Sequence, residues 1–153
     1  MCRYLCTLKA GDPATVEGPY GRFRFESDKP RQIWVAGGIG ITPFMARMEE
    51  LARQSRTEAA GTVDLFYSTK TPDETFIERL RGLARAAGVA LHLIASERDG
   101  KLDSARLCEE VPGWRDASLW FCGPAGFGHA LRHGLARRGF SLGDFHQELF
   151  DMR

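Results

Sequence analysis

The sequence lacks the features that would place it in a membrane or among charge-driven nucleic-acid binders. No apolar run approaches the roughly 20 residues that cross a bilayer. Residues 1–10 carry charge and have no long apolar core, so we expect no signal peptide. The formal net charge is only +1, which gives no general electrostatic reason to bind nucleic acid or an anionic membrane. We therefore expect a cytoplasmic protein.

Cysteine is also scarce, and its spacing does not suit a metal. The four cysteines are scattered, at Cys2, Cys6, Cys108 and Cys122. No second pair at zinc-like spacing follows the first two, so reduced thiols are the simpler interpretation. His129 and His133 are four residues apart and could share a helix face, but no third ligand stands near them. We expect no metal site.

What the chain does have is a glycine-rich stretch, QIWVAGGIGITP, at residues 32–43. Residues 33–36 are apolar and rich in strand formers, and three glycines follow, at Gly37, Gly38 and Gly40. Thr42 suits a helix N-cap and Pro43 the first helical position. A strand, a glycine turn and a helix N-terminus in this order favour anion binding. The alternative is a tight strand-to-helix turn with nothing bound.

Strand and helix patterns alternate from residue 31 onward, without repeats or low-complexity segments. The expected strands span residues 33–36, 62–67, 90–95, 118–122 and 144–149, and the expected helices 43–54, 73–87, 103–110 and 126–138. Repeated βα units favour an α/β fold with a parallel, doubly wound sheet, for which we expect the strand order 3-2-1-4-5. At 153 residues, the chain is long enough for one domain with a real core.

Residues 1–30 differ from the rest of the chain. They hold turn signals and short strand-like pieces, at residues 14–17 and 22–26, but are too few to bury a core of their own. This piece is either the end of something larger or a small packed appendage.

Three predicted strand ends carry polar or glycine-rich residues. They are residues 37–43, the Tyr-Ser-Thr-Lys run at 67–70, and Cys122-Gly123-Pro124. Because the carboxyl ends of parallel strands meet at one edge of a sheet, we expect these segments to form a dinucleotide groove.

Four motifs together resemble one family. AGGIGITP resembles the pyridine-nucleotide phosphate loop of the ferredoxin–NADP reductase superfamily, and FCGPAGF its motif beside the nicotinamide. EGPYGRF, at residues 17–23, resembles the end of its flavin-binding barrel, and HQELF, at 146–150, the segment whose final aromatic covers the flavin. The motifs occur in the family's order. Phe127-Gly128, after the Cys-Gly-Pro run, and the HQELF ending look most like those of ferric-reductase-like oxidoreductases.

The resemblance implies an NAD(P)H-binding domain of a flavin-dependent oxidoreductase. Hydride would pass from NADPH or NADH to FAD, and electrons onward to a haem, iron–sulfur or ferric iron acceptor in another domain or protein. Residues 31–153 would be the nucleotide domain, and residues 1–30 the C-terminal remnant of an FAD-binding barrel plus a linker. The chain would then be a fragment, inactive without its flavin half, from the cytoplasm or the cytoplasmic portion of a membrane-bound reductase. The alternative is a non-catalytic nucleotide-binding or docking module.

The resemblance also assigns roles to individual residues. The pyrophosphate turn would comprise Gly37, Gly38, Ile39, Gly40, Thr42 and Pro43, with Gly123 and Pro124 on the neighbouring strand end. Tyr20 and Gly21 would contact a flavin phosphate in the complete protein.

Three residues would act near the reacting rings. Cys122 would position the nicotinamide, Glu148 would orient a polar network, and Phe150 would stack on the flavin. Each has a simpler alternative: a buried strand-end cysteine, an exposed carboxylate and a C-terminal core anchor.

The preference between NADPH and NADH depends on cations that could bind a 2′-phosphate. Lys70, which follows Ser68, and Arg98 are the candidates. They favour NADPH slightly, although Lys70 could be a solvated charge and the nearby Asp73 and Glu74 would disfavour a phosphate.

Overall fold

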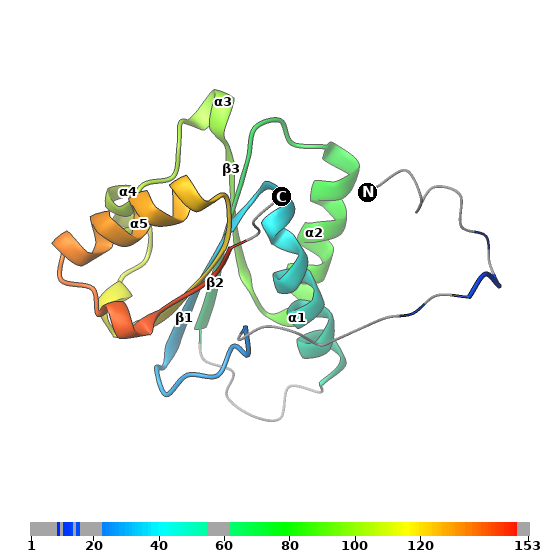
Figure 1. Cartoon of the computed structure of the whole chain (residues 1–153), viewed down its shortest axis with the longest axis horizontal. Helices are drawn as coiled ribbons and strands as arrows, with labels where there is room; N and C mark the ends of the chain where they lie inside the picture. Colours follow the sequence, from blue (N-terminus) through cyan, green and yellow to red (C-terminus); the bar gives the residue numbers. More distant parts are fainter. Residues whose placement is uncertain (1–8, 10, 14, 16–22, 55–61, 150–153) are drawn as a thin grey trace.

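A five-stranded, all-parallel sheet forms the centre of the molecule (Figure 1). The computed structural model describes residues 9, 11–13, 15, 23–54 and 62–149 of the chain. The strand order is β3-β2-β1-β4-β5, which confirms the predicted order. The strands are β1 (Arg31–Gly37), β2 (Thr62–Thr69), β3 (Ala90–Ala95), β4 (Ala117–Gly123) and β5 (Phe145–Leu149).

Helices cover both faces of this sheet, so the predicted doubly wound fold is also confirmed (Figure 1). The helices are α1 (Thr42–Arg53), α2 (Glu74–Ala87), α3 (Ser96–Asp99), α4 (Ser104–Glu110) and α5 (Ala125–Arg137). Short 3-10 turns add η2 (Gly38–Ile41), η3 (Trp114–Asp116) and η4 (Leu142–Asp144). The four-residue α3 and these turns were not predicted, because they are too short to show a helical period.

Alternation along the strands builds two cores. One lies between the sheet and α1 and α2, and it contains Trp34, Phe44, Leu65, Ile77 and Leu80. The other lies under α4 and α5, and it contains Ile33, Phe66, Leu119, Phe121 and Leu131. Successive side chains of a strand point to opposite faces, so neighbours such as Ile33 and Trp34 belong to different cores. None of the described helices is long and apolar enough to cross a membrane.

The segment before β1 departs from the sequence prediction. A strand was expected over residues 22–26, but residues 23–27 form none. Both edges of β1 are already paired, with β2 and β4, so no adjacent edge is free for another strand. Instead, Phe25 packs against the sheet face, with its ring centroid 5.0 Å from that of Trp34 and 5.2 Å from that of Trp120. The glycine-proline turn at residues 18–21 and most of the expected strand at 14–17 lie outside the described residues.

Candidate functional site

A cleft of about 520 Å³ opens at the carboxyl-terminal edge of the sheet. It lies beside the ends of β1 and β4, where successive connections leave for opposite faces, the position at which open α/β sheets bind ligands. The volume is within the range of small-molecule pockets. Its lining residues are Gly37, Gly38, Ser68, Thr69, Lys70, Ser96, Lys101, Leu102, Asp103, Pro124, Gly126, Phe127 and Ala130.

Gly37, Gly38 and Pro124 line the cleft where β1 and β4 end. A Cβ on Gly37 would lie 2.8 Å from Cδ of Pro124, so the two strand ends approach too closely for any side chain. Gly38 has φ +55°, a left-handed conformation that favours glycine, and a Cβ there would meet nothing within 4 Å. Backbone rather than side chains therefore faces a ligand here.

Gly40 serves packing rather than the cleft lining. A Cβ on it would lie 2.1 Å from the carbonyl oxygen of Cys122, so only glycine fits between the turn and β4. Gly123 is similarly tight, since its Cβ would lie 3.0 Å from the backbone nitrogen of Gly37. Gly40, the third glycine of the motif, is thus required for packing on β4, whereas Gly37 and Gly38 line the cleft. The sequence pattern alone could not distinguish these two roles.

Thr42 does not cap α1 as expected. It is the first residue of the helix, preceded by Ile41, and its Oγ1 donates to the carbonyl oxygen of Ile39 over 2.9 Å. The glycine turn forms a 3-10 turn, which moves the helix start one residue earlier and gives the hydroxyl a carbonyl partner. Pro43 lies in the first helical turn, and the side chain of Ile39 is 74% exposed at the tip of the turn.

Polar residues from the ends of β2 and β3 line the cleft as well. Ser68 and Lys70, both predicted site residues, are joined there by Ser96 and Lys101. Lys101 is the functional candidate that the sequence analysis missed. Lys101 follows the third strand, as Arg98 does, and this position could have identified it.

Arg98 does not line the cleft. Its side chain is 74% exposed, and its Nε donates to Oδ1 of Asp99 over 2.7 Å. This hydrogen bond lowers the pKa of Asp99, and the same contact raises the pKa of Arg98. The guanidinium already has a carboxylate partner in the next residue of α3, so it is not free for a ligand in the cleft.

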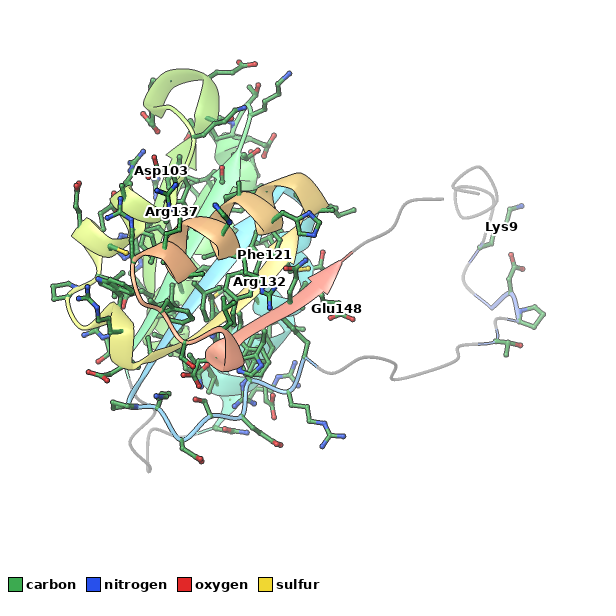
Figure 2. All side chains as sticks on the ribbon, turned by 60° about the vertical axis from the view of Figure 1, so that its left-hand side comes forward. Lys9, Asp103, Phe121, Arg132, Arg137 and Glu148 are labelled. Carbon is green, nitrogen blue, oxygen red and sulfur yellow. The ribbon has the colours of Figure 1, made fainter. Side chains whose placement is uncertain are left out.

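The first two turns of α5 complete the lining with Gly126, Phe127 and Ala130. The ring of Phe127 packs edge-on against Phe121, with 5.1 Å between centroids, and Figure 2 shows Phe121 beneath α5. A Cβ on Gly128 would lie 2.7 Å from the ring of Phe121. The Phe-Gly pair after Pro124 therefore seats the start of the helix closely on β4.

Cys122 points away from the cleft. It is fully buried in the core beside α1 and α2, and its register partner on β5 is Glu148 (labelled in Figure 2). Burial, and secondarily the charge of Glu148, raises the pKa of the Cys122 thiol to about 11. The thiol is therefore neutral at physiological pH, which fits a positioning or packing group better than a nucleophile. Glu148 itself is half-buried.

The remaining predicted site residues, Phe150, Tyr20 and Gly21, lie outside the described part of the chain. Among the described residues, no group of three or more potential ligands could hold a metal ion. The two cysteines described, Cys108 and Cys122, are both free.

The sequence is similar to reductases and reductase subunits. No protein-family model matches it. An NADPH oxidoreductase of Mycobacterium tuberculosis is 31% identical over 121 residues, 78% of this chain and 31% of that protein. The carnitine monooxygenase reductase subunit of Escherichia coli is 31% identical over 147 residues, 94% of this chain and 42% of that subunit. The chain thus spans less than half the length of these curated relatives.

Solved structures share the fold. The cytochrome b5 reductase domain of Ulva prolifera nitrate reductase has a TM-score of 0.75 at 24% identity, over 97% of this chain and 62% of that one. The FAD/NAD binding domain of a nitric oxide dioxygenase from Vibrio cholerae has a TM-score of 0.68 at 25% identity, over 86% of this chain and 56% of that one.

Fold and cleft together define a doubly wound α/β domain with a ligand site at its topological switch point. The predicted resemblance to the ferredoxin–NADP reductase superfamily is confirmed, and the chain has the fold of that superfamily's NAD(P)-binding domain.

Proposed function

We propose that this chain is the NAD(P)H-binding part of a flavin-dependent oxidoreductase. The observation that carries the proposal is the cleft at the β1 and β4 ends, with glycine backbone lining one part and two lysines another. The reductase relatives support it, since each is named for electron transfer and matches nearly all or most of this chain.

The residues of the cleft fit a dinucleotide. At Gly37 and Gly38 no side chain separates a pyrophosphate from the backbone, and Lys70 and Lys101 supply positive charge. Phe127 and Ala130 offer apolar surface for a ring. When bound, NAD(P)H would supply a hydride for a flavin. The chain's own residues would bind the pyrophosphate, orient the nicotinamide end toward Pro124 and exclude water through α5.

The two lysines favour NADPH over NADH. A 2′-phosphate needs charge-assisted donors, and Lys70 and Lys101 reach the same cleft from separate loops. Arg98, the other predicted cation, is engaged with Asp99 and is replaced in this proposal by Lys101. The name of the M. tuberculosis relative, an NADPH oxidoreductase, agrees with this preference.

The flavin and the final acceptor belong to the complete protein. Residues 1–30 are proposed to be the remnant of the FAD-binding barrel plus linker, and FAD to bind mainly outside these 153 residues. By itself the chain should bind nucleotide with little turnover. The acceptor is proposed to be an iron–sulfur, haem or ferric iron centre, and the oxygenase reductase relatives favour an oxygenase component that carries one.

Calorimetric titration of the chain with NADPH tests the proposal. We expect binding with a dissociation constant below about 1 mM, a free energy of at least about 4 kcal/mol. Ala130→Trp should abolish that binding by filling the cleft, whereas His133→Trp, on the exposed surface of the same helix, should not. Absence of heat with both NADPH and NADH at millimolar concentration, in a folded protein, would refute the proposal.

The second candidate is a non-catalytic nucleotide-binding or docking module. The burial of Cys122 favours it, because a thiol enclosed in the core beside α1 needs no role in hydride transfer to be retained. The rate of flavin reduction in a Cys122 variant of the complete protein separates the two, as argued in the Discussion.

A further inference from the structure

A row of five charged side chains runs from the first strand to the segment that lines the cleft. Oδ2 of Asp64 lies 2.7 Å from Nη1 of Arg31, and its Oδ1 lies 3.1 Å from Nε2 of His92. Nδ1 of His92 lies 3.3 Å from Oε2 of Glu110, and Oε1 of Glu110 accepts from Nε of Arg106 over 2.8 Å. The row joins β1, β2, β3 and α4.

Asp64 anchors this row. It is the only charged residue that is buried among those the structure describes, with 7% of its surface exposed. A buried carboxylate is costly unless charged donors surround it. Arg31 and His92 are those donors, so Asp64 favours the positively charged form of His92.

His92 is placed to act as a proton-dependent clamp. Each of its ring nitrogens faces a carboxylate, and only the imidazolium can donate from both. Its ring stacks on Phe66, with 4.3 Å between centroids and 10° between planes, which fixes the ring orientation. The hydrogen bond to Asp64, with the charges of Asp64 and Glu110, raises the pKa of His92 despite its partial burial.

No other charged group faces His92 from the elements packed around it in the described structure. Asp64 comes from β2 and Glu110 from α4, and Arg31 and Arg106 lie behind these two carboxylates. The neighbouring residues of β3, Leu91 and Leu93, pack into the opposite core, toward α2.

Arg106 connects the clamp to the cleft. Its Nη1 donates to the carbonyl oxygen of Asp99 over 3.1 Å, and its backbone nitrogen donates to Oδ1 of Asp103 over 2.9 Å. The same residue therefore holds both ends of the segment from Asp99 to Asp103, between α3 and α4 (Asp103 is labelled in Figure 2). That segment supplies Lys101 to the cleft.

We propose that His92 and Arg106 are positioning residues for the nucleotide site: protonated His92 holds Glu110 and Arg106 in place, and so orders the Lys101 segment for binding. This inference rests on the proposed nucleotide-binding function. When His92 loses its proton, it can still donate from Nε2 to Asp64, but the lone pair of Nδ1 then faces the carboxylate of Glu110. Glu110 is repelled, and its hold on Arg106 weakens.

The sign of the pH effect follows from the raised pKa. The charged form is favoured in the folded protein, so the stabilisation is fully present below the ordinary pKa of about 6.5 and is lost as pH rises through the higher folded value. Because the proposal makes the order of the Lys101 segment depend on protonated His92, nucleotide affinity should likewise decrease from mildly acidic to alkaline pH.

Calorimetry with NADP⁺ on the full chain, between about pH 6 and pH 8.5 at constant ionic strength, tests the coupling. We expect the dissociation constant of the wild type to rise on the order of three- to tenfold over this range. His92→Gln keeps a donor for Asp64 but cannot titrate, so its affinity should follow only the ionisation of NADP⁺ itself. His133→Gln, on the exposed face of α5, is the matched control and should behave like the wild type.

A nucleotide-free measurement keeps this inference separate from the proposed function. In NMR spectra of the unliganded chain, the backbone amides of Lys101 and Leu102 should shift with the titration of the His92 ring in the wild type and not in His92→Gln. The inference would be overturned if the NADP⁺ affinity of His92→Gln depended on pH as that of the wild type does. It would also be overturned if the amide shifts of Lys101 and Leu102 did not follow the titration of His92. A chain that binds no nucleotide at any pH yet shows the coupled titration would refute the proposed function alone.

Discussion

Two lysines reach the cleft from separate loops, and under the proposed function this arrangement makes the choice of nucleotide a property of single residues. Lys70 follows β2 and Lys101 follows α3, and both line the same cleft. A charge-assisted hydrogen bond to phosphate contributes about 1.5–3 kcal/mol. Loss of one lysine should therefore be visible in affinity for NADPH but not for NADH, which lacks the 2′-phosphate.

We expect Lys101→Ala to weaken NADPH binding by about 10- to 100-fold while changing NADH binding by less than about threefold. Calorimetric titration with each nucleotide measures the two constants. Arg98→Ala is the control, because Arg98 is exposed, paired with Asp99 and outside the cleft lining. An equal loss for both nucleotides would mean that Lys101 contacts the shared pyrophosphate instead.

At the scale of the elements, the glycine turn is fixed by its fit against the neighbouring strand. Gly40 packs on the carbonyl of Cys122, whereas Gly38 has open space but a left-handed φ. Gly40 is thus required because no side chain fits, and Gly38 because of its backbone conformation.

Gly40→Ala should destabilise the fold more than Gly38→Ala. The first change forces a Cβ to within 2.1 Å of a backbone oxygen, and such overpacking costs roughly 1–3 kcal/mol or more. The second change costs about 1 kcal/mol, the penalty of a side chain at positive φ. Urea unfolding of both variants measures the difference. Equal decreases in the free energy of unfolding would show that β4 shifts at little cost and that this contact does not fix the turn.

The secondary-structure elements also show which features of the fold and of the candidate site could be predicted from the sequence. The parallel sheet was predictable because short apolar strands alternate with amphipathic helices along the sequence. The glycine turn, Ser68, Lys70 and Pro124 were correctly expected at one edge, since parallel strands end together. Lys101 was missed because α3, with the sequence SERD, contains no apolar residue to reveal it.

Other parts depended on which face of the sheet a residue occupies. The position of Cys122 at a strand end was predictable, but the helices that cover its face of the sheet are known only from the packing of α1 and α2. Likewise, the phenylalanines at residues 23 and 25 alternate as a strand would, but Phe25 packs against Trp34 and Trp120 on the face of the sheet. Sequence spacing cannot report either fact, because both depend on distant segments.

At the scale of the whole molecule, the proposed hydride transfer requires this domain and a flavin to meet. We expect Cys122→Ser in the complete protein to slow flavin reduction by about tenfold, because Cys122 and its register partner Glu148 support the strand end beside the cleft. Stopped-flow absorbance with NADPH measures the rate.

The control for this variant is Cys108→Ser, which alters a half-buried thiol away from the cleft lining. Thermal unfolding of both variants must show a folded protein, since burying a hydroxyl at the Cys122 position costs about 1–3 kcal/mol without a partner. A flavin reduction rate equal to that of the wild type would assign Cys122 to packing alone and favour the non-catalytic module.

The strand order also dictates how the chain must assemble as it is made. The central strand β1 pairs with β2, which follows soon after it, and with β4, where Arg31 meets Ala117 only after three further helices. Until β4 is synthesised, one edge of an almost wholly apolar strand stays unpaired. Such distant pairing slows folding and exposes an aggregation-prone edge. Of the five strands of this sheet, the one before the glycine turn is therefore made first and is among the last to be fully enclosed.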